Sequence, residues 1–232
     1  MTDVVAVKGR IDVGAPAHVA VSTVLVLPPD ARCMLVLAHD AGTDMRHRAM
    51  EATARALAMN RVATLRFNFP YKEGGDWRTD PPPVTTATVR AAVDAAQAAA
   101  PALPLLAGGR SFGGRMTSTA AAEAPLPGVL GIVFFGFPLH PAGRPSVERA
   151  QHLDSVTVPM LFLQGSADAL AEPRLLHPVV EQLGERASLH VFKSADHGFR
   201  TPKRLGVTEG QLLQEAAQLV AAFAERLTRP AQ

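Results

Sequence analysis

A serine between glycines is the residue of this chain best suited to covalent chemistry. Residues 109–113 read Gly-Arg-Ser-Phe-Gly, between an apolar run over residues 103–108 and an alanine-rich run over residues 116–123. The first run predicts a strand and the second a helix, which places Ser111 on the turn between them. On such a turn the hydroxyl stands clear of the sheet, and the glycines make room for neighbouring backbone. We therefore interpret Ser111 as a nucleophile.

A nucleophilic serine needs a general base, and the base needs an acid that orients it. Asp168 directly follows an apolar strand pattern over residues 158–165, and His197 follows an alternating pattern over residues 187–192. Functional groups gather at the carboxyl ends of strands in parallel sheets. We therefore expect Ser111, Asp168 and His197 to meet at one edge of a sheet, in the chain order serine, acid, histidine.

Other ionisable residues fit these roles less well. Asp154 is the alternative acid, but it precedes the strand pattern that Asp168 follows. Asp196 adjoins His197 and is expected to cap a turn. His190 lies within a strand pattern and is expected to be a packed or edge residue. The remaining histidines do not follow a late strand: His18, His39, His47, His140, His152 and His177.

An acyl-transfer site also needs donors for the developing oxyanion, usually two backbone N–H groups. Phe112 follows the nucleophile and supplies the first, and Ala41, in the loop after the strand over residues 34–38, is expected to supply the second, with Asp40 as the alternative. His39 is expected to shape this loop. The Asp40 side chain is expected to cap the loop's own backbone; opposing the oxyanion, or binding a cationic or hydroxyl-bearing part of the substrate, are the alternatives.

Two further features concern the substrate. Arg110 adjoins the nucleophile, where it would either attract a substrate carboxylate or form a surface ion pair, and we favour the ion pair. Residues 68–84 carry Tyr71, Trp77 and several prolines. This loop forms either one wall of an open site, with Tyr71 touching the substrate, or a stiff connection that faces solvent.

Composition limits the class of protein. The chain has 232 residues, 47% hydrophobic and 19% charged, with a net charge of +2. Its basic residues are dispersed, so nucleic-acid binding is not expected. Cys33 is the sole cysteine, which favours a reducing compartment. No signal peptide or membrane span is indicated, and we expect a cytoplasmic protein. Neither a metal-ligand cluster nor a dinucleotide fingerprint occurs, so no metal and no cofactor are expected.

Apolar patterns along the chain alternate between strands and helices. They predict one α/β domain over residues 1–232, with a mostly parallel sheet covered by helices on both faces. Pro81, Pro82 and Pro83 are expected to break the chain. The predicted strands cover residues 4–11, 18–27, 34–38, 63–67, 103–108, 128–137, 158–165 and 187–192, and the predicted helices residues 46–59, 85–99, 116–123, 172–183 and 208–227.

Several motifs together resemble those of a known family. They are residues 37–42 (LAHDAG), 66–71 (RFNFPY), 108–115 (GGRSFGGR), 163–168 (LQGSAD) and 196–199 (DHGF). The chain is similar to the small, lidless dienelactone-hydrolase-like branch of the α/β-hydrolase superfamily. Within that branch it resembles a family shared by a testis-expressed protein and a subunit of the non-specific lethal chromatin complex. Asp40 departs from that family's pattern, which has glycine there.

The resemblance implies a Ser111–His197–Asp168 triad in a cytosolic, ester-cleaving domain. Many hydrolases of this fold insert a helical cap between two late strands, but residues 138–158 are too few for a substantial one. We expect a serine hydrolase that cleaves small carboxylic esters through an acyl-enzyme. The alternatives are a thioesterase or peptidase of the same fold, and a non-catalytic interaction module. The oligomeric state stays open.

Overall fold

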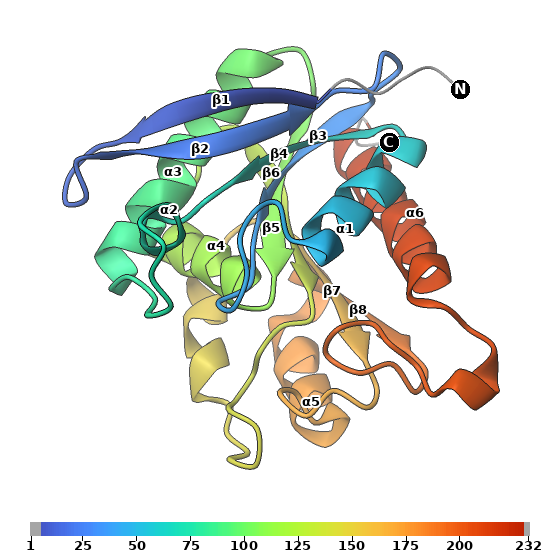
Figure 1. Ribbon diagram of the computed structural model, residues 1–232. Helices are drawn as coiled ribbons and strands as arrows, with labels where there is room; N and C mark the ends of the chain where they lie inside the picture. Colours follow the sequence, from blue (N-terminus) through green and yellow to red (C-terminus); the bar gives the residue numbers. More distant parts are fainter. Residues whose placement is uncertain (1–5, 230–232) are drawn as a thin grey trace.

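The computed structural model describes residues 6–229, which form one eight-stranded sheet with helices on both faces (Figure 1). The strand order is β1-β2-β4-β3-β5-β6-β7-β8. Strand β2 pairs antiparallel with β1 and β4, and the other neighbours pair in parallel. The strands are β1 (Ala6–Val13), β2 (Val19–Val26), β3 (Cys33–Ala38), β4 (Val62–Phe67), β5 (Leu105–Arg110), β6 (Val129–Phe135), β7 (Met160–Gly165) and β8 (Ala187–Phe192). The predicted α/β fold class is confirmed.

Helices cover the sheet in two layers. Helices α1 and α6 lie side by side on one face, and α3, α4 and α5 cover the other (Figure 1). The α-helices are α1 (Arg48–Met59), α2 (Pro70–Glu73), α3 (Pro82–Ala99), α4 (Phe112–Glu123), α5 (Pro173–Leu183) and α6 (Glu209–Thr228), and the 3-10 helices are η1 (Glu148–Ser155), η2 (Gly184–Arg186) and η3 (Lys203–Leu205). Within residues 6–229, no helix combines the length and the apolar composition needed to cross a bilayer.

The central strands are apolar throughout because both of their faces are buried. In β3, Met34 and Val36 pack under α3 and α4, whereas Leu35 and Leu37 pack under α1 and α6. This arrangement holds the carboxyl ends of β3, β5, β6 and β7 at one edge of the sheet, because these strands run in parallel. The loops at that edge carry the predicted site residues.

The predicted elements mostly agree with the structure, but several differ in their bounds or were missed. Pro82 and Pro83 do not break the chain but form the first turn of α3, where the missing N–H of proline has no helical partner to lose. Helix α4 begins at Phe112, before the predicted residue 116. The first turn was missed because Gly113 and Gly114 have a low helix propensity. The short helix α2 and the 3-10 helices η1, η2 and η3 were not predicted. The first strand was predicted over residues 4–11, of which Val4 and Val5 lie outside the described residues, and β1 covers Ala6–Val13.

Within the described residues 6–229, no large cap covers the carboxyl edge of the sheet. The segment between β6 and β7 holds the 3-10 helix η1 and connecting loops. The expectation that residues 138–158 are too short for a substantial cap is therefore confirmed.

Candidate active site

Ser111 occupies the sharp turn between β5 and α4. Its backbone has φ 48° and ψ −117°, which side-chain-bearing residues rarely adopt, and its N–H donates to the carbonyl of Phe135 at 3.1 Å. A non-glycine residue in such a conformation costs of order 1–3 kcal/mol and is typical of functional sites. The turn lifts the hydroxyl out of the sheet at the start of the helix.

Glycines next to Ser111 are required by close packing. A Cβ on Gly109 would lie 2.5 Å from the carbonyl oxygen of Ala38, and a Cβ on Gly113 would lie 2.5 Å from the carbonyl oxygen of His39. Both distances are shorter than any non-bonded contact that a Cβ atom makes in proteins. The turn can therefore approach the end of β3 only with glycine at these positions. The glycines of the motif therefore bring the serine close to the loop that follows β3.

The three predicted triad residues form a continuous chain of hydrogen bonds. His197 Nε2 lies 2.8 Å from Ser111 Oγ, and His197 Nδ1 lies 2.6 Å from Asp168 Oδ2. The Asp168 carboxyl group is fully buried, whereas 27% of the His197 side chain is exposed. Loops after β5, β7 and β8 supply the three residues, so the parallel sheet brings together groups far apart in the sequence.

A residue that the sequence analysis missed, Gln164, also binds the acid. Its Nε2 donates to Asp168 Oδ2 at 2.5 Å, and its Oε1 accepts from the N–H of Phe137 at 2.8 Å. The N–H of Leu170 donates to Asp168 Oδ1 at 2.7 Å. The carboxylate thus receives three hydrogen bonds, counting that from His197. Gln164 is the one polar side chain in the apolar pattern over residues 158–165, and a buried polar side chain needs a partner.

The competing residues have other roles. Asp196 Oδ1 accepts from the N–H groups of Gly198 and Arg200, at 2.8 and 2.9 Å, so its predicted place in a turn is confirmed. His190 lies on the edge strand β8, 2.9 Å from a carboxylate oxygen of Glu215, as expected of an edge residue. Asp154, the alternative acid, lies in η1, where Gln182 Nε2 donates to it at 3.4 Å.

The loop after β3 is held by His39, which is fully buried. The N–H of Phe69 donates to His39 Nε2 at 3.1 Å, so Nδ1 carries the ring proton and donates to the carbonyl of Asp40 at 2.8 Å. Burial lowers the pKa of His39 to about 4, and the ring is neutral near pH 7. The expectation that His39 shapes this loop agrees with these bonds, which tie the end of β3 to the end of β4.

The predicted oxyanion donors are Ala41 and Phe112. Within residues 6–229, neither N–H group forms a hydrogen bond. Phe112 is the first residue of α4, and N–H groups in the first turn of a helix have no acceptor within the helix. Asp40 Oδ1 accepts from the N–H of Gly42 at 3.1 Å, so the Asp40 side chain caps its own loop as expected. This bond uses one carboxylate oxygen.

Tyr71 has a supporting position rather than the predicted contact with substrate. Its side chain is buried, its hydroxyl donates to the carbonyl of Ala41 at 3.1 Å, and it does not line the cavity beside Ser111. Burial raises the pKa of the Tyr71 phenol, which keeps the hydroxyl protonated as a donor. Trp77 is 79% exposed, and Lys72 Nζ lies 4.0 Å from the centre of its ring. Trp77 therefore faces solvent.

An open cavity of about 460 Å³ lies beside Ser111 and His197. Its lining consists of Asp40, Ala41, Gly42, Arg110, Ser111, Phe135, Ala167, Ala169, Leu170, Asp196, His197, Gly198 and Arg200. Arg110 is only 5% exposed, and no carboxylate of the described residues forms an ion pair with it. The expectation of a surface ion pair for Arg110 is therefore wrong, because α1 and the turn after His197 enclose its side chain.

Comparison with known proteins identifies the family. A family model described as an alpha/beta hydrolase domain matches residues 31–225. The chain belongs to this family. The match includes the ends of β3, β5, β7 and β8, so it covers every residue of the hydrogen-bonded chain.

Solved structures share the fold. Dienelactone hydrolase from Anabaena variabilis has 22% identity and a TM-score of 0.74, with 97% of this chain and 99% of that chain covered. A serine hydrolase without a lid from Xanthomonas campestris has 22% identity and a TM-score of 0.69, with 98% and 96% covered. Est1E from Butyrivibrio proteoclasticus, solved with ferulic acid, has 15% identity and a TM-score of 0.74, with 94% and 99% covered. The α/β-hydrolase fold is thus confirmed.

Proposed function

We propose that this α/β-hydrolase is a serine hydrolase that cleaves small carboxylic esters through an acyl-enzyme. The observation that carries the proposal is the chain of hydrogen bonds from Ser111 through His197 to Asp168, at the wall of an open cavity. The strained backbone of Ser111 adds support, because such strain is typical of a nucleophile held for reaction. The family match and the single sheet support one catalytic domain over residues 1–232.

The distances support a two-step acyl transfer. Ser111 Oγ attacks the acyl carbonyl while its proton passes to His197 Nε2, 2.8 Å away. Asp168 holds the imidazole by its Nδ1–H and stabilises the imidazolium that forms. His197 then gives the proton to the leaving alcohol, and the acyl group stays on Ser111 until water, activated by the same histidine, releases it.

The N–H groups of Phe112 and Ala41 stabilise the tetrahedral oxyanion in this mechanism. Both are free of other hydrogen bonds among the described residues; Phe112 begins α4, and Ala41 lies in the loop after β3 and lines the cavity. Loss of one such donor typically lowers kcat about 10²–10³-fold. Tyr71 and His39 keep the Ala41 loop in place through its carbonyl groups.

The proposed substrates are small because the cavity is open and no large cap from residues 6–229 encloses it. Similar structures support ester or lactone cleavage over other acyl chemistry, since they include a dienelactone hydrolase and an esterase domain from Rhodothermus marinus. A small-molecule ester is therefore the proposed binding partner of this site.

Labelling by a fluorophosphonate probe, together with turnover of p-nitrophenyl acetate and butyrate, tests the proposal. Ser111→Ala should abolish both the labelling and the turnover while the melting temperature shows a folded protein. Ser155→Ala, at an exposed position, is the matched control and should keep both. Turnover retained by a clean preparation of Ser111→Ala would refute the triad, and a folded wild type that neither binds the probe nor cleaves an ester would favour a non-catalytic module.

A further inference from the structure

Arg110 places a buried positive charge in the wall of the active-site cavity. It is the last residue of β5 and directly precedes Ser111. Its side chain is 5% exposed, yet it belongs to the lining of the cavity that Ser111 and His197 share. The guanidinium carbon lies 5.5 Å from the centre of the Phe199 ring. Arg110 therefore adjoins the space that a substrate would occupy.

The hydrogen-bonding capacity of Arg110 is largely unused. Nη1 donates to Thr53 Oγ1 at 3.3 Å, which is a long bond to a neutral partner. Nε is buried and has no partner among the described residues, and Nη2 makes no hydrogen bond to them. Burial lowers the pKa of Arg110, and the charges of Asp40, Glu209 and Asp196 oppose that effect from beyond ion-pair distance. The guanidinium thus lacks an anion in contact with it.

An unpaired buried charge is costly, since burying one ion costs several kcal/mol unless an opposite charge compensates. Arg66 provides a contrast within the same protein. It is also buried, and its Nε has no partner among the described residues, but it donates to the carbonyl of Met45 at 2.7 Å and does not line the cavity. Arg66 therefore stabilises a backbone carbonyl away from the cavity, whereas Arg110 lines the cavity beside Ser111.

We propose that Arg110 binds a carboxylate carried by the substrate, so that the preferred substrates are anionic esters. This inference rests on the proposed ester hydrolysis, which it narrows to one substrate class. A planar guanidinium matches a carboxylate in shape as well as in charge. A monoanion suits the site better than a dianion, because Asp40 and Asp196 also line the cavity and only Asp196 is paired, with Arg200 at 3.2 Å.

Matched ester pairs test this proposal. The charge lies on the acyl side in mono-p-nitrophenyl glutarate against p-nitrophenyl pentanoate, and on the leaving-group side in 4-acetoxybenzoate against phenyl acetate. In at least one pair the wild type should favour the charged ester by about 10- to 100-fold in kcat/KM, as expected for a hydrogen bond to a charged group. Arg110→Met should reduce that ratio to about one, and Arg110→Lys, which keeps the charge but not the planar fork, should give an intermediate ratio.

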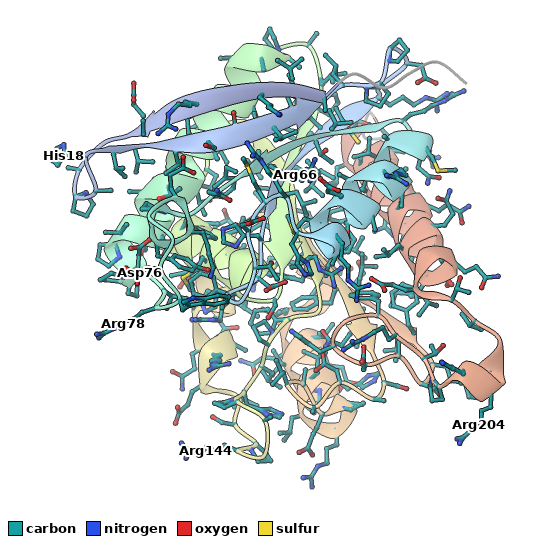
Figure 2. The ribbon with its side chains drawn as sticks, viewed as in Figure 1. His18, Arg66, Asp76, Arg78, Arg144 and Arg204 are labelled. Atoms are coloured by element: carbon teal, nitrogen blue, oxygen red, sulfur yellow. The ribbon has the colours of Figure 1, made fainter. Side chains whose placement is uncertain are left out.

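The control removes a charge of the same sign elsewhere. Arg204 projects from the surface in η3 (Figure 2), and Arg204→Gln should leave the wild-type ratio unchanged. A wild type with no preference in either pair would overturn the proposal, as would a preference that survives in Arg110→Met. If Ser111-dependent turnover persists in those cases, the proposed hydrolase function stands and only the substrate class fails.

A binding measurement decides the matter without turnover. Calorimetry should show that the wild type binds benzoate at least about tenfold more tightly than benzamide, and that Arg110→Met abolishes this difference. Because the wild type alone gives the first comparison, the result holds even if Arg110→Met does not fold. Equal binding of benzoate and benzamide by the wild type would refute the carboxylate site.

Discussion

Replacing Gln164 by leucine tests whether the hydrogen bonds to Asp168 matter for catalysis. The substitution removes the 2.5 Å bond from Gln164 Nε2 to Asp168 Oδ2 and leaves the buried N–H of Phe137 without its acceptor. A hydrogen bond to a charged group contributes about 1.5–3 kcal/mol, and an unsatisfied buried donor costs about 1–3 kcal/mol. The apolar leucine recovers part of this loss. We therefore expect the free energy of unfolding to fall by about 2–4 kcal/mol.

The effect on activity should appear in kcat. Gln164 does not line the cavity, so KM should change little. With one of its three donors lost, Asp168 holds His197 less firmly in line with Ser111, and we expect kcat to fall by about 10- to 100-fold, because small misplacements of a catalytic group are costly. Esterase kinetics and urea unfolding measure both effects. Gln182→Leu, at an exposed position in α5, is the matched control.

A folded Gln164→Leu variant with wild-type kcat would refute the reasoning, since it would show that Leu170 and His197 alone orient the acid. A fall in kcat/KM caused mainly by KM would also contradict it, because it would mean that Gln164 shapes the cavity.

Three further predictions concern the loop after β3, the cavity and the pH dependence of stability. Asp40→Gly should lower the free energy of unfolding by about 1 kcal/mol, because it loses the bond to the N–H of Gly42, and change kcat by less than about threefold; a rise of about tenfold or more would show that the carboxylate opposes the oxyanion. Among neutral p-nitrophenyl esters, kcat/KM should be highest for acetate and butyrate, since an open cavity of about 460 Å³ encloses little of a long chain, and a steep rise toward palmitate would reveal an acyl tunnel. Burial lowers the pKa of His39 from 6.5 to about 4, so the unfolded chain binds a proton between these values that the folded protein does not. The free energy of unfolding should therefore fall as the pH drops from 6.5 toward 4, and His39 should contribute up to about 3 kcal/mol to that fall. Denaturant unfolding at pH 7 and pH 5 should show a smaller fall for His39→Gln than for the wild type. An equal fall in the two proteins would contradict a buried, neutral His39.

Local patterns of the sequence were sufficient to predict which residues form the hydrogen-bonded chain from Ser111 to Asp168. Ser111, Asp168 and His197 each follow a short apolar run, and the direction of parallel strands then places all three at one edge of the sheet. The same reasoning predicted the turn at Asp196, the hydrogen bond between the Asp40 side chain and its own loop, and too short a segment between β6 and β7 for a cap domain. Each of these depends on residues close in sequence. The exceptions were boundary effects of proline and glycine, as at the starts of α3 and α4.

Tertiary structure decided how the side chains around the triad are used. Whether Arg110 reaches solvent depends on α1, which contributes Thr53, and on the turn that contributes Phe199. Tyr71 turns toward the carbonyl of Ala41 because the loops after β3 and β4 meet, and Gln164 binds Asp168 because both are enclosed where β7 ends. Burial and hydrogen bonding at these positions depend on elements that are distant in sequence. The periodicity of apolar residues shows which face of a strand is apolar, but it does not show which helix or loop packs against that face.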